Sequence, residues 1–264
     1  MSASSPTSIA AFLMLERPRI IAHRGVSGDA PENTLVAFEK AIQMRADMIE
    51  LDVTFTRDGQ VVCLHDETLD RTTSGSGDPR TQTLEELREL DAGSWFDAQY
   101  AGERMPTLDE ALRLMKDEIL VNIEIKSEAV DEGEEPGIVE AIAALVKRLD
   151  MVDQVVISSF SRRGLERSRR VAPEIARAVL YTDDQYPDLA PGAALLALEA
   201  VAVNVHHRQA TLSTVKDVHG AGGIVMVYTV NDPALAETLF VNGVDAIFSD
   251  QPGQMIALFT RGKT

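Results

Sequence analysis

Short β-rich runs alternate with helical patterns along almost the whole chain, and this alternation constrains the fold more than any other feature of the sequence. The predicted strands are short runs of apolar and β-branched residues: Ile20–Arg24, Met48–Phe55, Glu118–Lys126, Gln154–Ser158, Ile175–Leu180, Ala200–Val205, Gly223–Val227 and Asp245–Phe248. The predicted helices have apolar residues at three- and four-residue spacing: Thr34–Arg45, Leu108–Lys116, Gly137–Leu149, Ser161–Arg170, Gly192–Leu198, Leu212–His219, Ala234–Asn242 and Gly253–Thr260.

This rhythm predicts an α/β protein, because alternating strand–helix units place the strands in parallel through right-handed crossovers. Eight such units in about 250 residues match the closed (β/α)8 barrel, or TIM barrel. An open doubly wound sheet is the alternative, although it would rarely need eight repeats. Asn33 and Asp232 precede predicted helices as N-caps, the second followed by Pro233 at the first turn. We therefore predict a single barrel domain over residues 1–264.

One long segment, Thr56–Met105, breaks the rhythm after the second strand. It opens with the turn signal Arg57-Asp58-Gly59 and a short strand, Gln60–Leu64, which together predict a hairpin. Residues 83–90 then predict a short capped helix. In a barrel, an insertion at this point lies at the C-terminal face, where active sites are built. The aromatic residues of the insertion either cover the cleft or are buried within the insertion itself; they are Trp95, Phe96 and Tyr100.

Charge and cysteine content exclude several classes of protein. The chain has 42 acidic and 25 basic residues, a net charge of −17, and such a surface repels nucleic acids and anionic bilayers. No run approaches the roughly 18–20 apolar residues of a membrane helix, so we expect no stable membrane insertion. The lone Cys63 cannot form an internal disulfide. Residues 1–19 lack the basic start of a secretory signal and predict a tail with a short helix over Ile9–Leu15, and we expect a cytoplasmic location.

Acidic residues alternate with apolar ones on two of the predicted strands. Residues two apart on a strand point the same way, so Glu50 and Asp52 share a face, as do Glu124 and Lys126 on the next strand. The apolar residues between them suit the layer against the helices, which places the acids inside the barrel. Burying three carboxylates costs several kcal/mol per ion unless a cation compensates. All-oxygen ligands predict Mg²⁺, Ca²⁺ or Mn²⁺; an ion-pair network without metal is the alternative.

Two histidines are candidates for proton transfer. His23 and Arg24 end the first strand, which places both at the face where barrel enzymes carry their sites. An imidazole titrates near neutral pH, and a guanidinium has the planar fork that suits phosphate oxygens. His65 follows the hairpin strand and precedes Asp66, which could orient its ring. By spacing alone, His65 is equally well a surface or core residue.

These residues belong to a series of ordered motifs. Five lie in the first half of the chain: His23-Arg24-Gly25, Pro31-Glu32-Asn33-Thr34, Glu50-Leu51-Asp52-Val53, Val62-Cys63-Leu64-His65-Asp66 and Asn122-Ile123-Glu124-Ile125-Lys126. Three more follow: Ser159-Phe160, Tyr228-Thr229-Val230-Asn231 and Gly243-Val244-Asp245-Ala246-Ile247-Phe248-Ser249-Asp250. Together they resemble the glycerophosphodiester phosphodiesterases, and the resemblance runs from Ile20 to about Pro252. Tyr228 stands where that family often carries Trp, and Ala246 where it often carries Gly.

The resemblance implies a metal-dependent TIM-barrel hydrolase that cleaves glycerophosphodiesters into sn-glycerol 3-phosphate and an alcohol. The implied metal ligands are Glu50, Asp52 and Glu124, the implied general acid–base pair is His23 and His65, and the implied phosphate contacts are Arg24 and Lys126. The resemblance does not fix which histidine is the acid, which metal is native, or which headgroup is preferred. Attack on phosphorus by the glycerol 2-hydroxyl or by water is equally compatible with the sequence, which is silent on the oligomeric state.

Two other functions use the same residues. One is lysophospholipid cleavage with the same histidines, which would need an apolar groove or a membrane-docking surface. The other is a barrel that binds a phosphate ligand without catalysis, although a binder has no need of two proton-transfer groups. The basic run His206-His207-Arg208, at the end of the sixth barrel strand, either binds phosphate or a headgroup or is a solvated loop.

Overall fold

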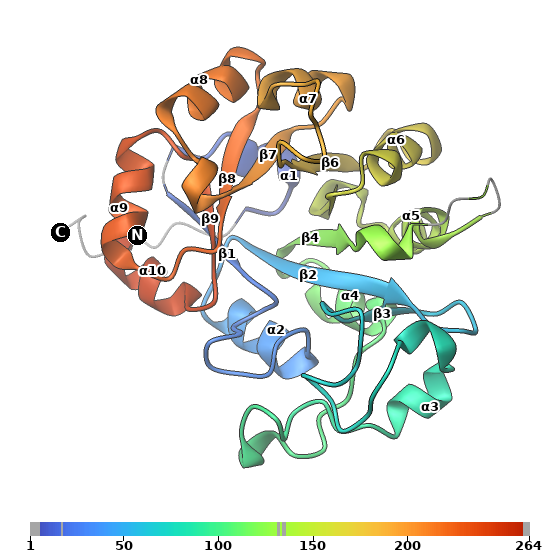
Figure 1. The fold of residues 1–264 in the computed structure, drawn as a ribbon. Coiled ribbons are helices and arrows are strands. Elements are labelled where there is room, and N and C mark those ends of the chain that lie inside the picture. Colours follow the sequence, from blue (N-terminus) through green and yellow to red (C-terminus); the bar gives the residue numbers. More distant parts are fainter. Residues whose placement is uncertain (1–5, 17, 131–132, 134–135, 261–264) are drawn as a thin grey trace.

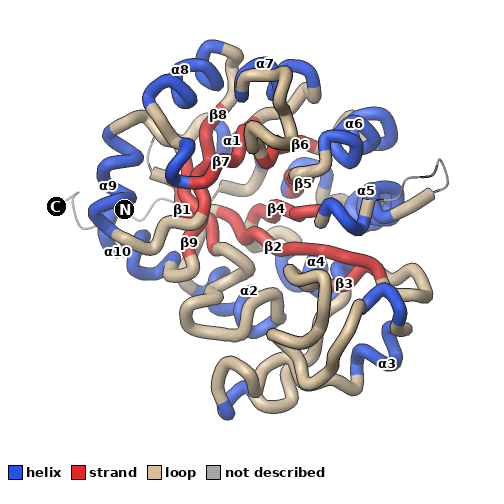
Figure 2. Tube along the Cα trace, viewed as in Figure 1, coloured by secondary structure: helices blue, strands red, loops and turns tan. Residues whose placement is uncertain are grey.

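The computed structural model describes residues 6–16, 18–130, 133 and 136–260. Within them, eight parallel strands close into a barrel (Figures 1 and 2): β1 (Arg19–Ala22), β2 (Met48–Phe55), β4 (Leu120–Ile125), β5 (Val155–Ser159), β6 (Ala176–Leu180), β7 (Ala202–His206), β8 (Ile224–Tyr228) and β9 (Ala246–Ser249). β1 pairs in parallel with both β2 and β9, and these pairings close the sheet. The predicted TIM barrel is therefore confirmed, and the open sheet is excluded.

A ring of helices surrounds the strands (Figure 1): α2 (Leu35–Gln43), α4 (Leu108–Met115), α5 (Ile138–Arg148), α6 (Arg162–Val171), α7 (Pro191–Ala197), α8 (Leu212–Gly220), α9 (Pro233–Val241) and α10 (Pro252–Thr260). Short 3₁₀ turns lie at Pro79–Thr81, Ala98–Tyr100, Ser127–Ala129, Val152–Gln154 and His207–Gln209. Each helix of the ring overlaps a helix predicted from the spacing of apolar residues. Asp232 caps α9 as predicted, with its side chain accepting from the backbone N–H of Ala234.

The alternation on the strands separates two environments. Leu51 and Ile123 belong to the large apolar cluster between strands and helices, as the pattern predicts. A second cluster fills the barrel itself near its N-terminal end, where Met48 and Leu120 meet Phe12 of helix α1 (Ile9–Leu13). Helix α1 therefore forms an apolar floor under the barrel, and the polar residues of the strands lie above it, toward the C-terminal ends.

The insertion forms a small unit beside α2 and α4 (Figure 1). Strand β3 (Val61–Cys63) pairs antiparallel with the end of β2, which confirms the hairpin, and helix α3 (Leu84–Arg88) carries a capping box. Its own apolar cluster is centred on Val62, Leu69 and Leu87. Tyr100 is buried against α2 and donates a hydrogen bond to the carbonyl of Asp29.

Several predicted boundaries differ from the structure by one or two residues, and the differences at His23, Arg24 and Asn33 matter for the site. β1 ends at Ala22, so His23 and Arg24 lie in the following turn, where Arg24 (φ 54°) and Gly25 (φ 81°) both adopt left-handed conformations that end the strand. Asn33 is not the N-cap of α2; Thr34 takes that place and accepts a hydrogen bond from the N–H of Ala37. No helix in the described part of the chain is long and apolar enough to span a bilayer.

Candidate active site

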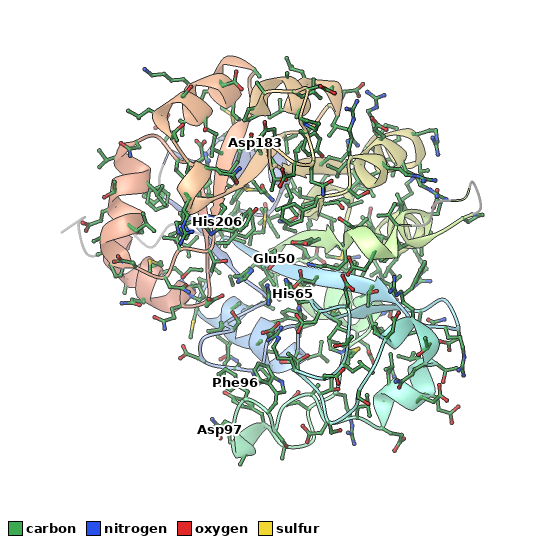
Figure 3. All side chains as sticks on the ribbon, in the orientation of Figure 1. Glu50, His65, Phe96, Asp97, Asp183 and His206 are labelled. Carbon is green, nitrogen blue, oxygen red and sulfur yellow. The ribbon has the colours of Figure 1, made fainter. Side chains whose placement is uncertain are left out.

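A pocket of about 180 Å³ opens at the C-terminal ends of the strands. One wall carries six of the seven predicted residues: His23, Arg24, Glu50, His65, Glu124 and Lys126. Asp52, the seventh, lies beside them in contact with Arg24 and Lys126. The opposite wall carries the apolar side chains of Phe160, Leu180, Tyr228 and Phe248, here called the apolar wall, and also the polar residues Ser158, Asn204 and Thr229. Figure 3 shows Glu50 and His65 over the barrel, with Phe96 farther out on the insertion; Trp95, Phe96 and Tyr100 do not line the pocket.

The three predicted acids form one cluster because β2 and β4 are in register. Asp52 pairs with Glu124 across the two strands, and the carboxylates of Glu50, Asp52 and Glu124 each offer an oxygen within 4.8 Å of the others. Lys126 Nζ donates to Glu124 at 2.9 Å and lies 3.5 Å from Asp52. Glu50 Oε1 is buried without a hydrogen-bond partner in the described part of the chain. An orphaned carboxylate oxygen among oxygen donors fits a bound divalent cation.

The electrostatics of the cluster also fit a cation. Burial and the neighbouring charge of Asp52 raise the pKa of Glu50 to about 8. The same two causes raise the pKa of Glu124. Burial acts in the same direction on Asp52, but Arg24 and Lys126 outweigh it and lower the pKa of Asp52 to about 2. The two cations therefore balance one carboxylate well and leave the other two undercompensated, which is where a divalent ion would contribute most.

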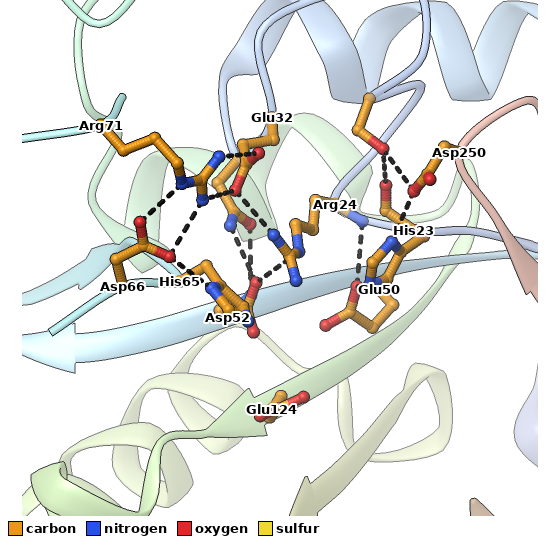
Figure 4. A network of polar contacts seen from close by, with 12 residues as sticks. His23, Arg24, Glu32, Glu50, Asp52, His65, Asp66, Arg71, Glu124 and Asp250 are labelled. Carbon is orange, nitrogen blue, oxygen red and sulfur yellow. Dashed lines mark hydrogen bonds and ion pairs between the residues drawn. The ribbon is translucent and has the colours of Figure 1, made fainter. Parts of the chain in front are cut away.

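His23 is held by Asp250, the residue that follows the neighbouring strand β9. Its Nδ1 lies 2.6 Å from Asp250 Oδ1, and its Nε2 lies 4.0 Å from Glu50 Oε2 (Figure 4). Asp250 accepts further hydrogen bonds from Ser27 Oγ at 2.9 Å and Asn231 Nδ2 at 2.6 Å. Burial alone would lower the pKa of His23, but the bond to Asp250 and the charge of Glu50 raise it. Because the carboxylate of Asp250 occupies Nδ1, the other ring nitrogen, Nε2, is the one that faces Glu50 and the acidic cluster.

His65 has the same arrangement on the insertion. Its Nδ1 lies 2.6 Å from Asp66 Oδ1, as the adjacent position in the sequence suggested. Asp66 is itself bound by Arg71, whose Nε donates to Asp66 Oδ2 at 2.6 Å. Burial lowers the pKa of His65. The two imidazoles thus enter the pocket from different elements, each with its Nδ1 on a carboxylate.

Arg24 contacts two acids of the cluster, Glu50 and Asp52, and also Glu32 outside it. Its backbone N–H donates to Glu50 Oε2 at 2.9 Å, its Nη1 to Glu32 Oε1 at 2.8 Å, and its Nε lies 3.3 Å from Asp52 Oδ2. Asn33 fixes Asp52 in two ways: its Nδ2 donates to Asp52 Oδ2 at 2.9 Å and its Oδ1 accepts from the Asp52 N–H at 3.2 Å. A residue expected to cap a helix therefore orients a member of the acidic cluster.

The basic run at the end of β7 borders the apolar wall. The His206 ring lies 5.9 Å from the ring of Tyr228 and 4.0 Å from that of His207. Arg208 is exposed, and no ion pair to it is present among the described residues. Tyr228 itself lines the pocket, so His206 lies next to the mouth of the pocket.

The sequence profile of the "Glycerophosphoryl diester phosphodiesterase family" matches residues 23–254. The chain belongs to this family. It is 39% identical over 244 residues to a "Glycerophosphodiester phosphodiesterase" of Caldanaerobacter subterraneus subsp. tengcongensis, covering 92% of this chain and 98% of that protein. It is 33% identical to the "Glycerophosphodiester phosphodiesterase" of Bacillus subtilis, covering 91% of this chain and 86% of the relative.

Solved structures agree with these relatives. The glycerophosphodiester phosphodiesterase from Agrobacterium tumefaciens matches with a TM-score of 0.79 and 33% identity, covering 91% of this chain and 99% of that chain. A phosphodiesterase from Oleispira antarctica, solved in complex with the product sn-glycerol-3-phosphate, matches with a TM-score of 0.79 and 32% identity, covering 92% of this chain and 97% of that one. The predicted family and enzyme class, phosphodiesterase, are confirmed.

Several residues that support the site were not predicted as such, among them Asp250, Asn33 and Arg71. Asp250 carried a signal, because it directly follows β9, and closing the barrel makes β9 the neighbour of β1. Asn33 was assigned to a helix end, although its left-handed backbone (φ 57°) is one that asparagine adopts readily in turns. Arg71 lies in a loop with no periodicity, and no local pattern of the sequence pairs it with Asp66 and Glu32.

Proposed function

We propose that this chain hydrolyses glycerophosphodiesters to sn-glycerol 3-phosphate and an alcohol, with His23 and His65 as its general acid–base pair. One observation carries the proposal: two imidazoles of a member of this family enter one pocket, each with Nδ1 bound to a carboxylate. Phosphodiester hydrolysis needs one group to take a proton from the nucleophile and another to protonate the leaving alcohol. The free Nε2 atoms of His23 and His65 supply two such groups.

The cations of the pocket bind the phosphate in this proposal. Negative charge on the phosphate oxygens rises toward the transition state, so Arg24 and Lys126 stabilise that state more than the bound substrate. Both are anchored by acids, Arg24 by Glu32 and Lys126 by Glu124, so neither has to be reorganised when substrate binds.

Glu50, Asp52 and Glu124 would hold the divalent cation, Mg²⁺, Ca²⁺ or Mn²⁺. A bound ion of this kind supplies Lewis-acid stabilisation of charge on phosphate oxygens. The protein's part is to keep three carboxylates together inside the barrel at a position adjacent to Arg24 and His23.

The size of the pocket favours a small, water-borne diester. About 180 Å³ is enough for a glycerophosphate and part of a small headgroup, and the apolar wall formed by Phe160 and Tyr228 suits the carbon skeleton of either. A lysophospholipid would have to leave its acyl chain outside this pocket. Cleavage of lysophospholipids is therefore an outcome of the test below.

The test is release of glycerol 3-phosphate from glycerophosphocholine and glycerophosphoethanolamine, first with EDTA and then with Mg²⁺, Ca²⁺ or Mn²⁺ added back. We expect release only with metal. Glu50→Gln should lower both metal affinity and rate, whereas Glu237→Gln, an exposed change on α9, should alter neither. If neither substrate is cleaved while calorimetry shows bound metal, the proposed substrate class is wrong, and lysophospholipids become the next candidates.

A further inference from the structure

We propose that Arg71 is a positioning residue that locks catalytic His65 of the insertion against the barrel. The inference deepens the proposed function and rests on it for the role of His65. It arises from a side chain that no strand or helix pattern explains and that lies outside the pocket wall, yet connects both halves of the polar network (Figure 4).

The guanidinium of Arg71 makes two forked contacts at once. On the insertion it binds Asp66, with Nε to Oδ2 at 2.6 Å and Nη2 to Oδ1 at 3.0 Å. On the barrel side it binds Glu32, with Nη1 to Oε2 at 2.8 Å and Nη2 to Oε1 at 2.7 Å. Asp66 holds His65, and Glu32 holds Arg24. One side chain therefore links the residue that orients an imidazole to the residue that anchors a predicted phosphate ligand.

Only a planar fork can make this link. Arginine presents its donors in one rigid plane that matches two carboxylates, whereas a lysine ammonium is a single point charge on a flexible stem. Trp95 adds a further constraint, since the guanidinium carbon lies 5.8 Å from the centre of its ring. Through this contact the Trp95 ring, which belongs to the insertion, would help to hold the plane of the Arg71 guanidinium.

Removing Arg71 would release Asp66. The hydrogen bond from Arg71 holds the pKa of Asp66 well below its usual range, so Asp66 is ionised and accepts a hydrogen bond from His65 Nδ1. Without the guanidinium, the carboxylates of Asp66 and Glu32 would repel each other with no cation between them. Glu32 would still be held by Arg24, but Asp66 would be free to rotate away. His65 would then lose the anchor that fixes its tautomer and the direction of its Nε2.

The first test is kinetic and uses the metal-loaded full chain with glycerophosphocholine, or whichever diester the wild-type protein cleaves. Arg71→Ala and Asp66→Asn should each lower kcat by ~10–100-fold. The double variant should lose little more than the larger single loss, because both changes remove the same support. Arg71→Lys should stay close to Arg71→Ala although it retains the charge. Arg57→Ala, an arginine of the insertion that forms an ion pair with Glu86, serves as the matched control and should keep wild-type rates.

The second test needs no turnover and so separates this inference from the proposed function. The ¹⁵N signals of the His65 ring, assigned with His65→Ala, should show one tautomer with Nδ1 protonated in wild-type protein. In Arg71→Ala they should move to the averaged values of free imidazole, while the protein stays folded and its Mg²⁺ affinity stays unchanged. A single His65 tautomer retained in Arg71→Ala would overturn the inference, as would kinetic losses that multiply in the double variant.

Discussion

At the scale of single residues, each imidazole of the pocket is paired with a carboxylate, and the chain supplies the two pairs differently. Asp66 is adjacent to His65 in sequence, whereas Asp250 lies 227 residues from His23 and reaches it through the β1–β9 pairing. In both pairs Nδ1 faces the carboxylate, so Nε2 is available to a substrate. Because the two imidazoles enter the pocket from different elements, we predict that neither histidine can replace the other.

We expect His23→Ala and His65→Ala each to lower kcat by at least ~10², since general acid–base catalysis contributes about that much. Metal affinity should remain, because neither imidazole belongs to the acidic cluster. Steady-state kinetics and calorimetric titration with Mg²⁺ check the two statements. A near-normal rate in either variant would remove that histidine from the proposed pair.

The sequence predicted six of the seven side chains of the polar cluster from strand alternation and strand ends, which locate them one element at a time. His65 was predicted from the resemblance to the family, because its spacing alone was equally compatible with a surface or core residue. Glu50 and Asp52 follow from the period of β2, and Glu124 and Lys126 from that of β4. Their supporting residues could not be found in this way. To predict the contact of Asp250 with His23, one must know that the barrel closes by pairing β9 with β1. To predict the contacts of Arg71, one must know the path of a loop that has no periodic pattern.

At the scale of elements, the turn after β1 places His23 and Arg24 over the acids by packing tightly on α2. Gly25 has φ 81°, and a Cβ there would lie 2.7 Å from the carbonyl carbon of Ala37 in α2. Backbone atoms cannot move aside as a flexible side chain could. Gly25 belongs to the motif His23-Arg24-Gly25, but only the packing of the turn on α2 shows why no side chain fits at this position.

Gly25→Ala should therefore lower the free energy of unfolding by about 3 kcal/mol or more, combining left-handed strain with overpacking. Gly59→Ala is the matched control: Gly59 is also left-handed, at φ 75°, but a Cβ there would meet no atom within 4 Å. It should lose only about 1–2 kcal/mol. Urea unfolding measures both, and equal losses would show that α2 does not constrain the turn.

The end of β7 gives an element-level prediction for the headgroup. In a chain of net charge −17, Arg208 is exposed beside His206, which borders the Tyr228 wall of the pocket. If this run contacts the substrate, Arg208→Ala should raise KM several-fold and leave kcat unchanged, because the contact would be equal in ground and transition states. Arg170→Ala, an exposed arginine in the last turn of α6, is the control. Unchanged KM would assign the run to a solvated loop.

At the scale of the whole molecule, the barrel divides into an apolar end that supports folding and a polar end that carries the candidate active site. The count of strand–helix units was enough to predict the barrel, since few other folds use eight of them. The position of α1 was not predictable, because a short apolar run shows that a helix packs somewhere but not against which surface. The structure places it under the barrel, with Phe12 among Met48, Leu120 and Met226.

This division predicts that stability and catalysis can be changed separately. Phe12 is 1% exposed and the Arg19 guanidinium carbon lies 5.4 Å from its ring centre, so Phe12→Ala should lower the free energy of unfolding by about 3–5 kcal/mol. Met14, at the end of the same helix, is 80% exposed, and Met14→Ala should stay within about 0.5 kcal/mol of wild type. Both variants should keep the wild-type kcat while folded, because the floor lies at the end of the barrel opposite the pocket. Urea unfolding measures the stability of both variants, and steady-state kinetics on the folded proteins measures kcat. A lower kcat in folded Phe12→Ala would mean that the packing of the floor affects the positions of the acids above it, which would contradict the prediction.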